Sequence, residues 1–252
     1  MNYKNLKQEN RENYAIIQIA NSKNNSLDSS TLKELTNAIV NLDKEKKIKC
    51  IGLVGNSKFF SPGADINELK KLNQKEAKKI KLFDSIKKIE KIKKPLISFI
   101  EGYAIGGGLE LALYTDFIIA SKKAKFGLPE INLGLIPGMG GTQNTKKFLT
   151  KQNIKYLTMT GNIIDAESAM KIGLVSEIFY EENFMDHVER FLKKISIKPK
   201  ESLRTLKELI NSNTSIKNGI NAERQIFYKL LDSDNKKKGI DSFLNKTIPK
   251  FD

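Results

Sequence analysis

The chain has 252 residues, of which 39% are hydrophobic and 29% charged, so it is long enough to bury a sizeable core without covalent staples. Cys50 is the single cysteine, which excludes an internal disulfide. His187 is the single histidine, and we interpret it as an ordinary helix residue. Histidine-based catalysis and transition-metal sites are therefore without candidates. The net charge of +15 rests on 44 basic residues of which only four are arginine, and this scarcity of the usual reader of base edges argues against sequence-specific binding of nucleic acids.

The cellular location is predicted from what the sequence lacks. No run of about 18 apolar residues indicates a membrane span. Residues 1–13 are polar and have no apolar core of a signal peptide. We therefore expect a cytoplasmic protein that has no membrane partner and holds no metal, in which carboxylates, lysine or tyrosine carry any acid–base chemistry.

Strand-like and helix-like segments alternate from the N-terminus. Residues 14–19 are rich in β-forming side chains and predict a strand. Residues 28–30 offer helix caps, and leucines and isoleucines then repeat at helical spacing as far as Leu42. Residues 50–54 form a short apolar run before Gly55, a pattern typical of a buried strand.

The middle of the chain continues this alternation. After a turn at residues 61–63, the spacing of apolar residues predicts a long lysine-rich helical region that runs to Lys94 and is ended by Pro95. Residues 96–100 predict the next buried strand, and residues 117–120 predict another after a short apolar helix. Alternation of this kind favours an α/β fold with largely parallel strand pairing.

Beyond about residue 190 the strand signal fades. Helices are predicted around residues 203–210 and 220–231, after Pro199. We therefore expect two parts, a core with the active site over residues 1–190 and a helical C-terminal region over residues 191–252.

Three consecutive glycines, Gly106 to Gly108, lie between a predicted strand and a predicted helix. Glycines let the backbone approach a ligand closely, and the first N–H groups of a helix have no partner within it. Such a turn stabilises negative charge, on a phosphate or on an oxyanion that develops at a carbonyl. The spacing matches neither Gly-x-Gly-x-x-Gly nor a P-loop, so nucleotide binding through those motifs is unsupported.

Two glutamates accompany this turn. Glu110 lies two residues after the glycines at the start of an apolar helix, where the helix dipole alone would also favour a carboxylate. Glu130 lies among apolar residues, which would raise its pKa toward a range suited to proton transfer. A second glycine-rich loop follows at residues 134–141. Two carboxylates near an oxyanion-binding turn suit reactions that move protons next to a carbonyl.

Three segments in this order and spacing resemble the enoyl-CoA hydratase (crotonase) family. They are Phe60 to Ile66, Gly102 to Leu111 and Phe126 to Gln143. Shorter matches lie at residues 25–28, at residues 169–175 and in the basic and aromatic tail at residues 249–251. The resemblance covers the chain from about residue 14 to its end.

The resemblance implies a crotonase-like spiral of ββα units followed by a helical region for trimerisation, usually in a homotrimer or a dimer of trimers. It also implies that residues 191–252 serve oligomerisation and cover the active site. The family binds acyl-CoA thioesters, so coenzyme A is part of the substrate and no separate cofactor is expected.

The resemblance also assigns roles to individual residues. Ala64 and Gly107 are implied as the backbone N–H donors of the oxyanion hole. Glu110 is implied to orient and deprotonate one water, Glu130 to deliver a proton to Cα of the substrate, and the backbone of Gly138 to help hold the water. The substrate and CoA contacts implied are Lys23, Asn24, Pro62, Ala64, Asp65, Ile66, Asn67 and Gly107.

The sequence departs from the family pattern at two positions. The family often has a lysine where Asn67 stands, near the CoA phosphates, and an arginine where Asn144 stands. Lys70 and Lys71 are candidates to replace the missing lysine. Both departures concern the binding of CoA and neither touches the two glutamates.

We therefore predict an enoyl-CoA hydratase that adds water to trans-2-enoyl-CoA thioesters. One alternative is an enoyl-CoA isomerase or another acyl-CoA reaction of the same family, because the fold hosts many. A second is RNA binding through a lysine-rich helix at residues 68–94, which carries eleven lysines against four acidic residues. Because lysine is enriched along the whole chain, we do not expect nucleic acid as a partner.

Overall fold

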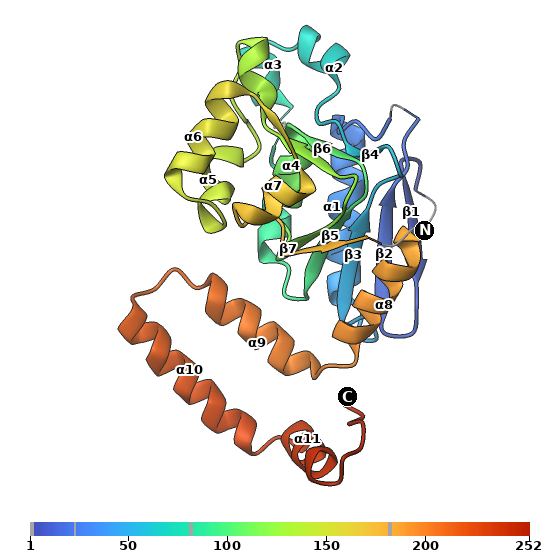
Figure 1. Cartoon of the computed structure of the whole chain (residues 1–252), viewed down its shortest axis with the longest axis vertical. Coiled ribbons are helices and arrows are strands. Elements are labelled where there is room, and N and C mark those ends of the chain that lie inside the picture. Colours follow the sequence, from blue (N-terminus) through green and yellow to red (C-terminus); the bar gives the residue numbers. More distant parts are fainter. Residues whose placement is uncertain (1–2, 23, 81–82, 181–182) are drawn as a thin grey trace.

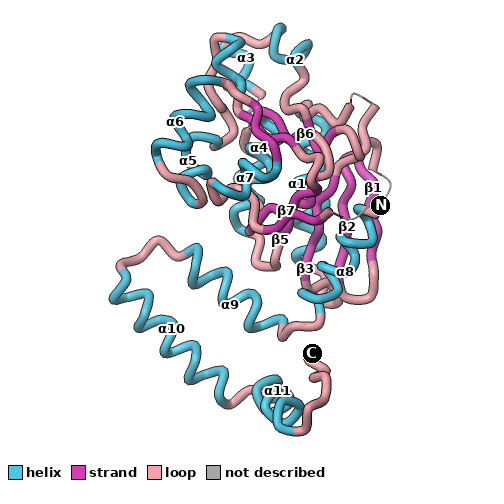
Figure 2. The backbone as a smooth tube through the Cα atoms, viewed as in Figure 1, coloured by secondary structure: helices cyan, strands magenta, loops and turns pink. Residues whose placement is uncertain are grey.

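A computed structural model of the chain describes residues 3–22, 24–80, 83–180 and 183–252. Within them, two sheets form the body of the molecule, and helices surround them (Figures 1 and 2). In spatial order the larger sheet contains β1 (Leu6–Asn10), β2 (Tyr14–Ile19), β3 (Cys50–Val54), β5 (Leu96–Ile100), β7 (Phe117–Ser121) and β10 (Glu177–Phe179). Only β1 in this sheet runs antiparallel to its neighbour.

The larger sheet is buried on both faces, as the continuous apolar runs of its central strands predict. Alternate side chains of β3 enter different clusters. Ile51 and Leu53 pack on the side of α1 (Ser29–Lys44), whereas Cys50 and Val54 pack on the side of α8 (Phe184–Ser196). The two helices therefore sandwich the sheet.

The smaller sheet orders its strands β4 (Phe59–Ser61), β6 (Tyr103–Ile105), β8 (Lys125–Gly127) and β9 (Ile163–Asp165). The strands β4, β6 and β8 pair in parallel, and β9 joins them antiparallel. Successive strand pairs β3–β4, β5–β6 and β7–β8 each place one strand in the larger sheet and the next in the smaller sheet. This repetition, with helices between the pairs, confirms the predicted α/β spiral of ββα units.

Helices and short 3-10 turns fill the intervals between these strands. Helix α4 (Gly107–Ala112) follows β6, and the 3-10 turn η2 (Pro129–Leu133) follows β8. Further along the chain lie α5 (Gly141–Asn144), the 3-10 turn η3 (Thr145–Lys147), α6 (Lys151–Thr160) and α7 (Ala166–Lys171). No helix among the described residues has both the length and the apolar character needed to cross a membrane.

The prediction of one lysine-rich helix over residues 68–94 is wrong. The region contains α2 (Ile66–Lys71), α3 (Gln74–Lys79) and a 3-10 turn, η1 (Ile86–Lys91). The first helix ends at its C-cap, Leu72. Asn73 then starts the second, because its side chain accepts the N–H of Glu76 while the Glu76 carboxylate accepts the N–H of Asn73. Lys94 is buried and donates to the carbonyls of Leu42 and Glu45 at the end of α1, so it is not a surface charge.

The last three helices, α9 (Lys200–Asn211), α10 (Ile216–Leu231) and α11 (Asp234–Leu244), form an arm that projects from the body (Figure 1). None of the three contains a buried residue. Helix α8, which precedes the arm, extends beyond residue 190, and its Leu192 still packs on the larger sheet. The body therefore extends to the end of α8, a few residues past the expected boundary.

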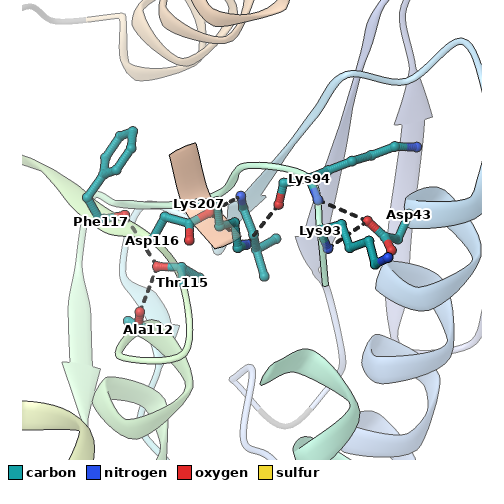
Figure 3. Close-up of polar contacts among 9 residues, drawn as sticks. Asp43, Lys93, Lys94, Ala112, Thr115, Asp116, Phe117 and Lys207 are labelled. Atoms are coloured by element: carbon teal, nitrogen blue, oxygen red, sulfur yellow. Dashed lines mark hydrogen bonds and ion pairs between the residues drawn. The ribbon is translucent and has the colours of Figure 1, made fainter. Parts of the chain in front are cut away.

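A partly buried ion pair fixes α9, the first helix of this arm, to the body (Figure 3). Lys207 of α9 donates to Asp116 Oδ2 and to the carbonyl oxygen of Lys94, at 2.8 Å in each case. The same Asp116 oxygen accepts the N–H of Leu96, at the start of β5. One carboxylate thus joins the arm, the larger sheet and the segment that follows α4.

Candidate active site

A mostly apolar cavity of about 450 Å³ lies between α2, α4, η2 and the glycine-rich loop at residues 134–141. A pocket of this size can enclose a small acyl group together with the part of a ligand next to it. Eight of the predicted site residues line it: Pro62, Ala64, Asp65, Ile66, Gly107, Glu110, Glu130 and Gly138.

Two backbone segments meet at one wall of this cavity. Gly106 has φ +52° between β6 and α4, and Gly63 has φ +96° just after β4. A Cβ atom on Gly63 would lie 2.9 Å from the nitrogen of Gly107, and one on Gly107 would lie 3.5 Å from the nitrogen of Ala64. Glycine at position 63 therefore allows the backbone nitrogens of Ala64 and Gly107 to approach each other, an arrangement suited to an oxyanion.

The carboxylate of Glu110 is buried and held by backbone donors. Its Oε1 atom accepts the N–H groups of Met139 and Gly141, at 2.7 Å each. Burial raises the pKa of Glu110, and these two hydrogen bonds, together with one from Gly138, oppose that rise. The glycine-rich loop thus favours the ionised form of Glu110, the form that can accept a proton.

Glu130 lies in a different environment, in the first turn of η2. Both of its carboxylate oxygens are buried without a hydrogen-bond partner in the described part of the chain. Burial raises the pKa of Glu130 to about 7, with a further rise from the negative charge of Glu110 and an opposing effect of its own backbone N–H. The Oε1 atom lies 3.2 Å from where a Cβ on Gly106 would be, so the carboxyl faces the glycine turn.

The two glutamates therefore have unequal tasks available to them. A carboxyl whose pKa is near 7 can both give and take a proton at neutral pH, whereas backbone donors oppose the rise that burial causes in the pKa of Glu110. The negative charge of Glu110 also contributes to the raised pKa of Glu130, so the ionisation of Glu130 depends on Glu110. The arrangement can activate a water and protonate a carbon beside a stabilised oxyanion.

Two predicted contacts, Asn67 and Asn24, do not join this set. Asn67 lies on α2 and is exposed, and its backbone N–H donates to Asp65 Oδ1 at 2.9 Å. Asn24 is exposed in a turn with φ +53°. Neither is among the residues that line the cavity. Lys23 lies outside the described residues.

The sequence interpretation missed the apolar wall of the cavity. The residues of this wall are Leu69, Leu72, Phe83, Leu133, Leu135, Ile136 and Met139. Phe83 approaches the glycine-rich loop, because a Cβ on Gly138 would lie 3.0 Å from its Cζ atom. Its apolar neighbours were interpreted as one face of a continuous helix, and that error concealed the wall. A signal was available in the capping pattern of Asn73 and Glu76, which breaks the helix.

A third glutamate of the cavity wall has a structural partner. The carboxylate of Glu68 on α2 accepts the hydroxyl and, at 3.2 Å, the backbone N–H of Ser29, the first residue of α1. This contact holds α2 against α1 at the side of the cavity. Among the described residues, no three His, Cys, Asp or Glu side chains gather where they could hold a metal ion.

Comparison with known proteins identifies the family of the chain. Residues 9–252 match the family model described as enoyl-CoA hydratase/isomerase. A probable mitochondrial enoyl-CoA hydratase of Dictyostelium discoideum is 35% identical over 227 residues, which cover 89% of this chain and 82% of that protein. A crotonyl-CoA hydratase of Syntrophomonas wolfei is 32% identical, over 100% of this chain and 99% of that protein.

A solved structure gives the same result for the fold. The enoyl-CoA hydratase of Bacillus anthracis superposes with a TM-score of 0.92 at 27% identity, over 98% of this chain and 99% of that one. The match therefore includes the body, both motifs that carry the glutamates, and the C-terminal arm. The chain belongs to the enoyl-CoA hydratase/isomerase family and is an enzyme most similar to its hydratases.

Proposed function

We propose that this enzyme adds water to trans-2-enoyl-CoA thioesters and releases 3-hydroxyacyl-CoA. The observation that carries the proposal is the contrast between Glu110, bound by two backbone N–H groups, and Glu130, whose pKa is raised to about 7, on one cavity. The decisive experiment is a spectrophotometric assay with crotonyl-CoA. Loss of the conjugated thioester absorbance, with formation of 3-hydroxybutyryl-CoA, is the expected result.

In the proposed mechanism, the backbone N–H groups of Ala64 and Gly107 hydrogen-bond to the thioester oxygen. They stabilise the negative charge that develops there when a nucleophile adds at Cβ. Glu110 takes a proton from a water held with the help of the Gly138 backbone, and the resulting hydroxide forms the new C–O bond at Cβ. Glu130 gives its proton to Cα, and this forms the new C–H bond. Proton transfer from Glu110 to Glu130, directly or through solvent, then restores both carboxyls.

We propose that substrate is bound by residues that line the cavity and by lysines near it. Pro62, Asp65 and Ile66 lie beside Ala64 on the same wall and are proposed to contact the substrate next to its thioester. Lys70 and Lys71 in the last turn of α2 are exposed and basic, and we propose them for the CoA phosphates in place of Asn67. Contacts from Lys23 and Asn24 stay predictions. Coenzyme A enters as part of the substrate, and no separate cofactor takes part.

Hydration is favoured over isomerisation by the presence of two carboxyls in different environments, one held by backbone N–H groups and one without a hydrogen-bond partner among the described residues. Shifting a double bond needs one group that moves a proton between two carbons, whereas hydration needs a base for water and an acid for Cα. An assay with a 3-enoyl-CoA distinguishes the two reactions. Conversion of that compound to the conjugated isomer, at a rate above hydration of crotonyl-CoA, would overturn the assignment.

We further propose that the arm serves assembly into a homotrimer or a dimer of trimers. Large apolar side chains are exposed along it, beyond what a monomer surface usually carries. The most exposed are Ile210, Ile216, Phe243, Leu244 and Ile248, at 72–83%. Light scattering tests this, since a trimer has three times the 28.5 kDa of one chain.

A cytoplasmic location is proposed as well. It rests on the single cysteine, Cys50, which suits a reducing compartment. Cell fractionation decides it, and recovery of the protein with organelles would exclude it.

A further inference from the structure

A tyrosine one helical turn after Glu110 contacts the same loop that holds the glutamate. Tyr114 directly follows Leu113, the C-cap of α4, and lies four residues after Glu110. Glu110 accepts the N–H groups of Met139 and Gly141 from this loop. Tyr114 reaches the residue between those two donors, Gly140.

Gly140 has φ +103°, and its Cα hydrogen faces a polar pair. A Cβ atom at this position would lie 2.9 Å from the hydroxyl oxygen of Tyr114 and 2.8 Å from Nδ2 of Asn144. The Asn144 side chain hydrogen-bonds to the Tyr114 hydroxyl. The backbone N–H of Asn144 also donates to the carbonyl of Gly140, at 2.7 Å. The pair therefore contacts Gly140 through both side chains and through the backbone.

The surroundings of the pair show that it is built into the interior. Asn144 is 6% exposed, and Tyr114 is half-buried against the main core cluster. A buried amide that lost its partner would leave a costly unsatisfied polar group, so each side chain fixes the other. Asn144 is also one of the two positions at which the sequence departs from the family pattern.

We propose that Tyr114 and Asn144 are positioning residues that fix Gly140, and through it keep the N–H donors of Met139 and Gly141 on the Glu110 carboxylate. The inference rests on the proposed function of Glu110 as the base for water. Neither Tyr114 nor Asn144 lines the cavity, so neither is placed to touch substrate.

Loss of this pair is expected to raise the pKa of Glu110. If the loop moves, burial raises the pKa of Glu110 with less opposition from the backbone donors. The base then becomes protonated at higher pH, so the acidic limb of the activity profile moves upward. The other acidic groups near this assembly are Glu130, Asp65 and Glu68 on the cavity wall, and Glu90, whose charge acts on Tyr114. None of these is altered by the substitutions below.

The test uses Tyr114→Phe, Asn144→Leu and the double variant of the full-length protein. We expect each single variant to lower kcat for crotonyl-CoA hydration by about tenfold, with little change in KM, and to move the acidic limb to higher pH. The double variant is expected to lose no more than either single one, because the two residues act as a unit. Tyr156→Phe is the matched control, since its hydroxyl accepts a hydrogen bond from Asn162 at 3.2 Å on the exposed surface. It should leave all readouts unchanged.

A second readout does not depend on activity. Amide hydrogen exchange at Met139 and Gly141 should be faster in the variants than in the wild-type protein, while thermal melting shows that the fold is kept. Wild-type exchange at these two amides, or a lower kcat with an unmoved acidic limb, would overturn the positioning role. If the wild-type protein fails to hydrate enoyl-CoA, the proposed function fails, and the exchange measurement still decides whether the pair holds the loop.

Discussion

Replacing Glu130 by glutamine is expected to stabilise the fold at alkaline pH and to do so much less at acidic pH. The rise of its pKa from the ordinary 4.5 to about 7 means that the folded protein binds this proton more tightly than the unfolded chain does. The carboxyl therefore does not destabilise the fold below about pH 4.5. It destabilises the fold increasingly as pH rises from about 4.5 to about 7, and the effect is complete above this range, where it is ionised inside the cavity.

The magnitude follows from the same pKa values. A rise from 4.5 to about 7 corresponds to at most about 3 kcal/mol in the free energy of unfolding, and access of solvent to the cavity reduces this. Glutamine has the same shape and no charge to bury. The variant should thus gain up to about 3 kcal/mol over wild type at pH 8 and little at pH 4.5.

The assay is urea unfolding of both proteins at the two pH values, at one fixed protein concentration because assembly affects apparent stability. Glu12→Gln, at an exposed carboxyl, is the control and should show the wild-type dependence on pH. An equal stability gain of the Glu130 variant at both pH values would refute the reasoning, because the gain would then have no connection with ionisation.

Three further predictions concern catalysis. Glu110→Gln and Glu130→Gln should each lower kcat for hydration by about a thousandfold while binding of the CoA ester, measured by calorimetry, stays nearly intact; near-normal turnover in either variant would remove that residue from the mechanism. Because Glu130 donates as the neutral acid, kcat should fall as pH rises through about 7, and a flat profile between pH 6 and 9 would exclude it as the donor. Gly63→Ala should abolish most turnover, since its Cβ would lie 2.9 Å from the nitrogen of Gly107. Gly134→Ala is its control, with φ +68° and open space around the added methyl, and equal losses in the two variants would contradict the proposed oxyanion hole.

Four strands of the larger sheet, β2, β3, β5 and β7, and the glycine turn before α4 could be predicted from the sequence because their signals are local. The apolar runs of β3 and β5 are continuous, which is the pattern of strands buried on both faces. The glycine turn and the two glutamates lie in contiguous motifs. The smaller sheet is different: β4, β6 and β8 have three residues each, too few to show a periodicity, and only the family resemblance indicated them.

The errors have physical reasons as well. The apolar residues of the lysine-rich region suggested one helix, but Asn73 caps a new one, and that local pattern was overlooked. The burial of Lys94 could not be foreseen, because its partners are carbonyl oxygens of Leu42 and Glu45, about fifty residues earlier in the chain. The role of Tyr114 was equally hidden, since it depends on the left-handed backbone of Gly140 in a distant loop.

The ion pair between Lys207 and Asp116 bears on how copies of the chain would meet. The two side chains are only 12% and 21% exposed, and Lys207 also donates to the carbonyl of Lys94, so the first helix of the arm is oriented before any partner arrives. Association of copies then joins surfaces that are already formed, and little ordering entropy is lost in the encounter. The rate of assembly should accordingly depend on diffusion and on the surface charge of the arms rather than on a slow folding step.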